Sequence, residues 1–494
     1  MFINMWKNFE DEKKLFCIFL LVHFAVWTGI SLIRVIMPTD ALEGVYWGSL
    51  HDFGTPKHPP LAGWLTYWAY LPFKSDFCVY LMSQTFILAG FIYIYKLAKY
   101  FLDKNSAMLS VIILEGCWAY SYITGYYGFN PDVILLFTLP AITFYFYNCM
   151  AENKAEDWFK LGLIVGISFL NKYQTAFLLL PMLIWACSFK RDIFKNKFFY
   201  FSIILAFVIF LPHLLWLFKY NFFPFMYFEG ELNSLHWFYH IFAPTFFFIM
   251  QFAVIVGCLI IFALLKKKFK SPFKLMTENY EKKDIWFLLL LGFGPFVLHM
   301  IMGLIEGGNL RPRWGFEFWF LIGIMLFYFF PINITKKEFL FTLKSAYVVM
   351  FIVALALGGL LSIEQNYRSR YPVAHVFGDL KAEWAKLYDT PIKYVGGYLE
   401  WTLPLTIYGD THPKTILDTH GYKDPWLDAD DVKKSGALIV DRTYDQTIGY
   451  TRMSCPYLPE DYIIEPNEYK FIVKNAFGFP REYTIYYFIV PPMK

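Results

Sequence analysis

Charged side chains gather in the segment of residues 38–75, which reads PTDALEGVYWGSLHDFGTPKHPPLAGWLTYWAYLPFKS. Asp40 and Glu43 stand three residues apart, and Lys57 and His58 follow. A carboxylate can take the proton of a hydroxyl nucleophile, and cations can hold a phosphate group. Asp40 to Glu43 also fits a helix capping box, in which both side chains satisfy backbone amides. The two interpretations are compatible, since a capping Asp keeps one oxygen for another partner.

Three further sites in the sequence offer charge beside apolar runs. Lys172 separates two short apolar runs, and Arg311 and Arg313 flank a proline in EGGNLRPRWGFEF. An Arg fork matches phosphate oxygens, whereas Lys acts as a point charge, so all three are candidates for phosphate binding. The alternative for the Arg pair is snorkelling to lipid headgroups. Asp132 follows Asn130 and Pro131, so it either belongs to a helix start or faces a cavity as a sugar-binding group.

The segment 219–240 is rich in aromatic residues and carries Glu231 and His236. These residues either line an acceptor cleft, where aromatic faces stack on sugars, or lie at the membrane interface. The His and carboxylate spacings match no standard metal-ligand pattern, so we predict no metal and no cofactor.

The elements that position these residues are predicted to be membrane helices. The chain has 494 residues, of which 57% are hydrophobic, 22% aromatic and only 17% charged. Such a composition excludes a water-soluble enzyme and a disordered chain. A spanning helix needs about 20 apolar residues. Eleven such runs are predicted, near residues 14–37, 77–97, 106–124, 131–149, 158–171, 174–189, 198–217, 244–265, 285–304, 316–332 and 343–362.

The distribution of Lys and Arg predicts the orientation of these spans. Cations fill alternate loops, which are therefore expected to be cytoplasmic. An odd number of spans and a cytoplasmic N-terminus place everything after residue 363 outside the cytoplasm. The net charge of +4 gives no indication of nucleic-acid binding.

Composition changes after Ser362, and this change predicts two domains. Residues 1–362 form a transmembrane domain with its first outside loop at 38–75. Residues 363–494 alternate β-branched, aromatic and polar residues between turn signals, as in KYVGGYLEW and REYTIYYFIV. This pattern predicts a small soluble α/β domain.

Several motifs together resemble a known family. D-A-x-E with K-H-P-P-L, the K-Y pair at Lys172 and Tyr173, R-x-R-W-G, and YVGGY with DPW-x-D are similar to the polytopic glycosyltransferase family 39 group, which includes protein O-mannosyltransferases and lipid A aminoarabinose transferases. The resemblance implies a GT-C architecture, here with about 11 transmembrane helices and a small C-terminal periplasmic α/β domain. It also implies transfer of a sugar from a polyprenyl-phosphate carrier, with inversion at the anomeric carbon. His58 departs from some relatives at its position, and the outside domain is short.

The resemblance and the residue chemistry described above together predict roles for residues. Asp40 is expected to be the general base, with Glu43 positioning it or binding the sugar. Donor phosphate binding is expected from Lys57, His58, Lys172, Arg311 and Arg313. Sugar or acceptor binding is expected from Asp132, Trp314, Glu231 and His236.

The predicted function is an inverting membrane glycosyltransferase that uses undecaprenyl phosphate-linked sugar. Its acceptor is expected to be lipid A, lipopolysaccharide or another envelope component, and membrane lipids are further partners. The alternative is a polytopic transporter or lipid-linked sugar flippase. A transporter usually places its polar residues at the midplane. Here they gather in outside loops, and this favours the transferase.

Overall fold

The chain is described from a computed structural model, which covers residues 11–226, 237–275, 280–307, 310–417, 427–441 and 466–493. Its contacts divide it into two compact units. The first comprises Met1–Ser31, His51–Leu65 and Phe77–Leu357, and the second comprises Leu32–Leu50, Thr66–Asp76 and Gly358–Lys494.

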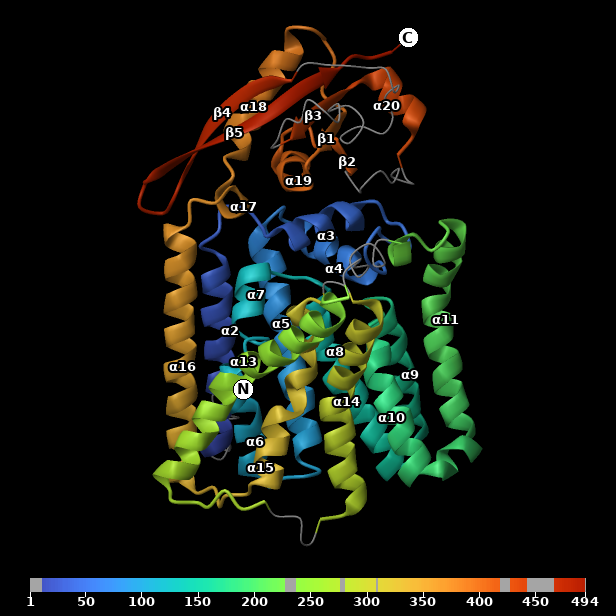
Figure 1. Cartoon of the computed structure of the whole chain (residues 1–494), viewed down its shortest axis with the longest axis vertical. Coiled ribbons are helices and arrows are strands. Elements are labelled where there is room, and N and C mark those ends of the chain that lie inside the picture. The colour runs from blue at the N-terminus through green and yellow to red at the C-terminus, as the bar shows by residue number, and fades with distance from the viewer. Residues whose placement is uncertain are drawn as a thin grey trace, which may run out of the picture. The chain divides into compact units, whose positions relative to one another are not determined.

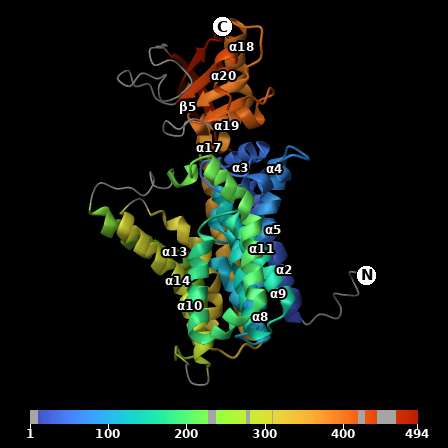
Figure 2. The ribbon, with the colours of Figure 1, turned by 90° about the vertical axis from the view of Figure 1, so that its right-hand side faces the viewer.

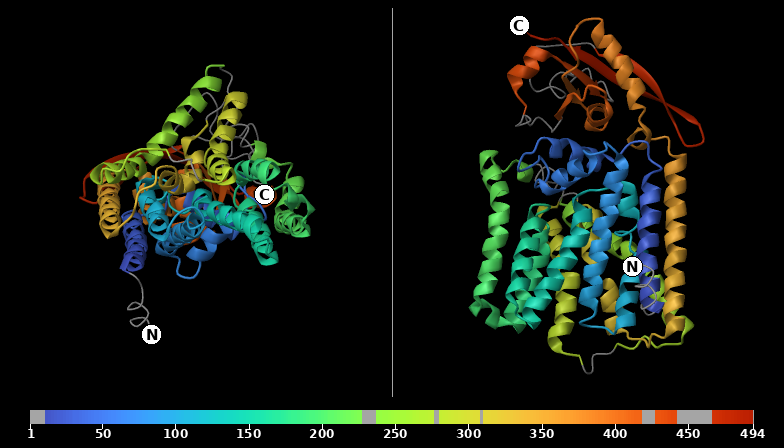
Figure 3. Two further views of the ribbon diagram at one scale, coloured as in Figure 1. Left: turned by 90° about the horizontal axis from the view of Figure 1, so that it is seen from below. Right: turned by 180° about the vertical axis from the view of Figure 1, so that it is seen from behind.

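The first unit is helical. Its elements are α2 (Asp11–Ser31), α5 (Asp76–Ala98), α6 (Lys104–Ile112), η1 (Ile113–Gly116), α7 (Tyr122–Tyr127), α8 (Pro131–Ala151), α9 (Ala155–Phe169), α10 (Thr175–Phe189), η2 (Arg191–Lys195), α11 (Lys197–Lys219), α13 (Tyr239–Lys268), α14 (Lys282–Glu306), η3 (Pro312–Leu321), α15 (Ile322–Phe329) and most of α16 (Lys336–Ile363). Helices α2 and α16 lie side by side (Figures 1 and 3), with the rings of Phe19 and Tyr347 6.0 Å apart. Helix α13 packs on α14, as the turned view in Figure 2 shows.

Seven helices in the described part of the chain are long and apolar enough to cross a membrane: α2, α5, α8, α11, α13, α14 and α16. Each has at least 21 residues, and at 1.5 Å per residue this length spans the hydrocarbon core. The membrane-helix prediction is therefore confirmed, but the count of eleven is not.

The remaining predicted spans form shorter or interrupted helices. The run at 106–124 becomes α6, η1 and α7, and the run at 316–332 becomes η3 and α15. Helices α9 and α10 have 15 residues each. Apolar composition alone did not reveal these interruptions, because they arise from close helix crossings and buried polar contacts.

The second unit contains a five-stranded sheet of order β2-β1-β3-β5-β4. Its strands are β1 (Tyr394–Gly397), β2 (Lys414–Leu417), β3 (Ala437–Asp441), β4 (Asn467–Lys474) and β5 (Pro480–Val490). Strand β1 pairs in parallel with β2 and β3, whereas β5 is antiparallel to β3 and β4. The predicted α/β character of the C-terminal part is confirmed.

The helices of this unit are α3 (Thr39–Ser49), α17 (Tyr367–Arg370), α18 (Val373–Ala385), α19 (Leu399–Tyr408) and α20 (Ala429–Ser435), and α4 (Leu61–Tyr70) is divided between the units. A core around Trp384 and Trp401 packs α18 and α19 on the sheet. Helix α3 packs on α19, and the Tyr46 hydroxyl donates to the carbonyl of Thr415 at 2.7 Å. Part of the segment 38–75 thus belongs to the same compact unit as the C-terminal sheet.

Candidate active site

A buried ion-pair cluster lies at the turn between α9 and α10 of the first unit. Lys172 donates from Nζ to Oδ1 of Asp132, and its Nζ lies 4.0 Å from Oε1 of Glu317. The three side chains are only 10%, 11% and 1% exposed. Charges in such surroundings are scarcely screened by water, so the electrostatic interactions within this cluster are strong.

The start of helix α8 fixes the position of Asp132. The side chain of Asn130 accepts hydrogen bonds from the amides of Asp132 at 2.9 Å and Val133 at 3.3 Å, so the predicted N-cap is confirmed. Asn171 donates from Nδ2 to the carbonyl of Pro131 at 2.9 Å. Asn171, the neighbour of Lys172, therefore links the turn between α9 and α10 to the start of α8, where Asp132 lies.

Three hydrogen-bonded hydroxyl groups fix the turn between α9 and α10. Ser168 Oγ lies 2.8 Å from Thr138 Oγ1 and 2.7 Å from Thr175 Oγ1, which joins α8, α9 and α10. Thr175 donates to the carbonyl of Lys172 at 3.0 Å. Lys172 is thus held in one backbone position before any ligand binds.

Glu317 was missed in the sequence analysis. It lies in η3, and neither carboxylate oxygen has a hydrogen-bond partner among the described residues. The signal was an acidic residue inside the apolar run GFEFWF, since an ionisable group in such a run is a functional candidate by itself.

Two glutamines position η3. Gln251 donates to the carbonyl of Pro312 at 2.9 Å and accepts from Trp319 Nε1 at 3.2 Å. Gln174, two residues after Lys172, donates to the carbonyl of Trp314 at 3.1 Å. The turn of Lys172 and the segment with Glu317 are therefore linked directly.

His58 and Lys57 lie in a tight turn organised by Thr55. Oγ1 of Thr55 accepts from the amide of His58 at 2.9 Å and donates to its carbonyl at 2.8 Å. Leu61 donates its amide to the carbonyl of Leu170 at 3.0 Å, and this bond attaches the turn to the end of α9. Thr55 was also missed, because one threonine in a loop carries no distinguishing signal.

The electrostatics of His58 reflect this neighbourhood. Burial lowers the pKa of His58 to about 3, and the charges of Lys172, Lys57 and Arg313 lower it while that of Asp132 opposes them. His58 is consequently a neutral imidazole near pH 7. It can orient a phosphate as a hydrogen-bond donor, but it adds no positive charge.

The Arg pair stands at the start of η3. Arg313 lies with its guanidinium carbon 5.3 Å from the ring centre of Tyr127, and it is close enough to affect His58. Arg311 is the N-cap residue of η3, and Trp314 follows inside it. Lys57, His58, Asp132, Lys172 and Arg313 therefore share one neighbourhood. The sequence analysis grouped the four basic residues as phosphate-binding candidates and treated Asp132 separately.

Asp40 and Glu43 lie on α3 in the second unit. The capping-box interpretation of these residues is wrong, because α3 begins at Thr39 with Pro38 as N-cap and without a side-chain cap bond. Asp40 instead occupies the first turn, where its charge favours the positive helix end. Glu43 is 4% exposed.

The remaining candidates do not enlarge the site. Glu231 and His236 lie outside the described residues. Glu115 accepts from Trp27 Nε1 at 2.9 Å and pairs with His23 Nδ1 at 2.6 Å, so it joins η1 to α2.

Among the described residues, no three His, Cys, Asp or Glu side chains are grouped to hold a metal ion. The absence of a metal stays a prediction.

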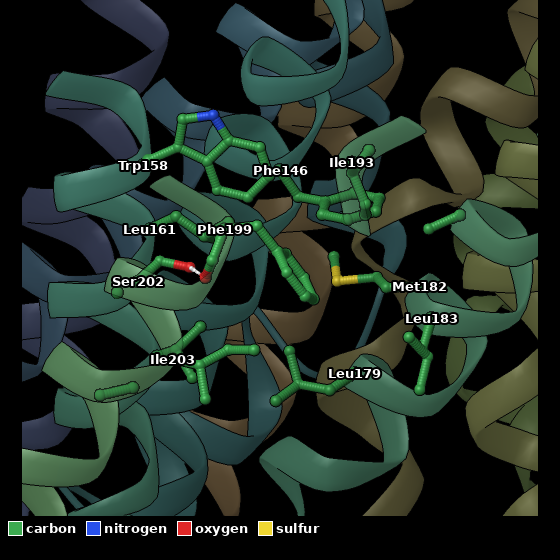
Figure 4. Close-up of a pocket in the computed structure, with 14 residues that line it drawn as sticks. Phe146, Trp158, Leu161, Leu179, Met182, Leu183, Ile193, Phe199, Ser202 and Ile203 are labelled. Atoms are coloured by element: carbon green, nitrogen blue, oxygen red, sulfur yellow. Dashed lines mark hydrogen bonds between the residues drawn. The ribbon is translucent and has the colours of Figure 1, made fainter. Parts of the chain in front are cut away.

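A cavity of about 220 Å³ lies apart from this cluster, between α8, α9, α10 and α11 (Figure 4). Trp158, Phe146 and Met182 are among its apolar lining residues. The hydroxyl of Ser202 at its wall already donates to the carbonyl of Phe199 at 2.7 Å. Such a lining suits hydrocarbon and offers no group for catalysis.

Comparisons with known proteins agree with this architecture. Residues 57–216 match the family described as Dolichyl-phosphate-mannose-protein mannosyltransferase. No curated protein sequence matches the chain.

The structure is similar to that of ArnT from Cupriavidus metallidurans bound to undecaprenyl phosphate, with a TM-score of 0.64, 13% identity and coverage of 95% of this chain and 97% of that chain. Its apo state aligns over the same shares with a TM-score of 0.62 and 14% identity. The predicted GT-C fold class and the resemblance to polytopic glycosyltransferases are confirmed.

Proposed function

We propose that the chain transfers a sugar from a polyprenyl-phosphate carrier to an envelope acceptor, with inversion at the anomeric carbon. The observation that carries this proposal is the neighbourhood of Lys172, Asp132, Glu317, His58 and Arg313 within a GT-C-like fold. The similar ArnT structure contains undecaprenyl phosphate, which supports a carrier of this class.

The cations of the cluster suit a phosphate leaving group. A phosphate ester leaves with its bonding electrons and gains negative charge, so it needs electrostatic support rather than a strong acid. Lys57 and Arg313 are partly exposed and act on this charge directly, while Lys172 is oriented by Asp132. His58 is neutral beside these cations, so in this proposal it donates a hydrogen bond to the phosphate and adds no positive charge.

Asp132 balances the charge of Lys172. Glu317 lies 4.0 Å from Lys172 Nζ, and burial raises the pKa of its carboxyl, which favours the neutral acid. Asp132 retains a second oxygen for a sugar hydroxyl. In this proposal Trp314, inside η3, contacts the sugar, and Arg311, the N-cap residue of η3, binds the donor phosphate.

Asp40 remains our proposal for the general base. An acceptor hydroxyl is a weak nucleophile until a carboxylate takes its proton. Asp40 lies in the first turn of α3 and is not its N-cap. Glu43, one helical turn further on, is proposed to position it. Lipid A is the first acceptor to test, followed by lipopolysaccharide core and protein.

The test is a transfer assay with the purified chain in nanodiscs and a polyprenyl-phosphate sugar labelled in the sugar. We expect the label to reach the acceptor and free polyprenyl phosphate to accumulate only when acceptor is present. Movement of intact labelled carrier between leaflets without cleavage would identify a flippase instead. In the same assay Asp40→Asn is expected to lose at least about 100-fold in turnover, while Asp52→Asn, in the same loop, retains it.

A further inference from the structure

The turn between β4 and β5 presents two aromatic side chains outward. It reads Lys474-Asn-Ala-Phe-Gly-Phe-Pro-Arg481, and Phe477 and Phe479 are 67% and 63% exposed. Gly478 stands between them with φ of +84°, a conformation that suits glycine. An exposed pair of phenylalanines at a loop tip indicates an interaction surface rather than a core.

The turn has a fixed shape. Oδ1 of Asn475 accepts from the amides of Phe477 and Phe479, both at 3.0 Å. The amide of Asn475 donates to the carbonyl of Phe479 at 3.1 Å. One side chain therefore organises the whole tip, so both rings are displayed by a rigid backbone and lose little conformational freedom on binding.

The same turn is bonded to the end of α16. The amide of Ala476 donates to the carbonyl of Ser362 at 2.9 Å, and Asn475 Nδ2 donates to the carbonyl of Ile363 at 3.2 Å. Gln365 donates to the carbonyl of Phe479 at 3.0 Å. Figure 1 shows the β4–β5 turn reaching this end of the helix.

Because α16 is long and apolar enough to cross a membrane, its last residues lie near the membrane boundary. Leu360 and Ile363, on its last turns, are 46% and 59% exposed. Together with Phe477 and Phe479 they form an apolar surface, which we call the hairpin patch.

Two exposed cations flank the hairpin patch. Lys474 ends β4 and Arg481 lies at the start of β5, one on each side of the aromatic tip. Apolar rings between cations match the boundary of a bilayer, where acyl chains lie below anionic phosphates.

We propose that the hairpin patch inserts Phe477 and Phe479 into the lipid interface at the membrane face where α16 ends, with Lys474 and Arg481 on phospholipid phosphates. The C-terminal sheet is then attached to the bilayer by its own side chains as well as by the chain connection. This contact is independent of the proposed transfer chemistry.

The test places photoreactive benzoylphenylalanine at position 477 of the full chain in nanodiscs of phosphatidylethanolamine and phosphatidylglycerol. The matched control carries it at Leu387, which is 62% exposed and follows the far end of α18. Both substitutions are at exposed apolar positions of the same unit, so neither is expected to disturb folding. We expect phospholipid adducts by mass spectrometry at 477 and only background at 387.

A second experiment tests the role of the two cations, and the identity of the adducts distinguishes lipid from protein partners. The variant Lys474→Gln/Arg481→Gln is expected to lower the adduct yield at 477 in nanodiscs with phosphatidylglycerol, and to lower it less in phosphatidylcholine alone, whose headgroup has no net charge. Adducts at 477 that are mainly with protein, including a second copy of the chain, would overturn the proposal. A lipid yield equal to that at 387 would do so as well.

Discussion

At the scale of residues, the charge cluster depends on the buried pair of Lys172 and Asp132, with Glu317 4.0 Å from the lysine. The sequence identified Lys172 and Asp132 separately, because each stood out against apolar surroundings. It did not predict their pairing across 40 residues, since that requires the close approach of α8 to the turn after α9.

The first prediction concerns this pair. Lys172→Met is expected to reduce transfer at least about 100-fold, because a preorganised charge is lost. It should also destabilise the fold by about 3–5 kcal/mol, because Asp132 is left buried without its partner. Lys172→Met/Asp132→Asn removes both charges and should regain thermal stability in detergent without regaining transfer.

The control for this prediction is Lys160→Met. Lys160 lies on the neighbouring helix α9 and pairs with Glu156 at 3.5 Å in an exposed position. Such a pair is worth at most about 1 kcal/mol, so stability and transfer should stay near wild type. A charge-balanced double variant that transfers normally would remove Lys172 from the mechanism.

The second prediction follows from the lowered pKa of His58, which is about 3 because of burial and neighbouring cations. In the unfolded chain this imidazole becomes protonated as pH falls below about 6.5. In the folded chain it stays neutral until pH approaches about 3. The folded state is thus destabilised progressively over this window. His58→Gln is expected to lose less thermal stability than wild type between pH 6.5 and pH 4.

The comparison variant is His375→Gln, which removes an imidazole that is 67% exposed on α18. If both variants show the same pH dependence of the unfolding temperature, the environment assigned to His58 is wrong.

At the scale of elements, close crossings explain why some predicted spans are interrupted. Gly116 in η1 meets Gly257 in α13 so closely that a Cβ on Gly257 would lie 2.5 Å from the carbonyl oxygen of Gly116. Next to this crossing, Glu115 is bonded to His23 and Trp27 of α2. Hydropathy could show that residues 106–124 are apolar, but not that a glycine contact and a buried carboxylate break the helix there.

The third prediction is that Gly257→Ala destabilises the first unit by about 1–3 kcal/mol, because the added methyl group would meet backbone atoms of Gly116 that have no room to move. Alanine is otherwise the better helix former by about 1 kcal/mol. Gly359→Ala in α16 is the matched control, since a methyl group added there would meet nothing within 4 Å. Thermal unfolding should fall for the first variant and hold or rise for the second; equal midpoints would contradict the crossing.

At the scale of the whole molecule, composition predicted a membrane protein with a small α/β part, and both features are confirmed. The sequence could not show that residues 32–50 and 66–76 group with the C-terminal sheet. That grouping rests on long-range contacts such as the hydrogen bond from Tyr408 to Asp76, 332 residues apart, and local patterns contain no such information.

The fourth prediction is the topology. Seven qualifying helices in the described part of the chain, like the eleven predicted spans, are an odd number. Because the Lys-rich loops predict a cytoplasmic N-terminus, a reporter fused after Lys494 is expected to be active outside the cytoplasm. Cytoplasmic activity of that fusion, with a fusion in the Lys266–Lys274 loop as the inside reference, would show that the span parity is wrong.

The most direct test of the central claim compares wild type with Lys172→Met/Asp132→Asn in nanodiscs, using a polyprenyl-phosphate sugar labelled in the sugar. We expect acceptor-dependent release of polyprenyl phosphate by wild type and loss of this release in the stably folded double variant. Release of polyprenyl phosphate at the wild-type rate by that variant, or no cleavage of the carrier by wild type with any envelope acceptor, would contradict it.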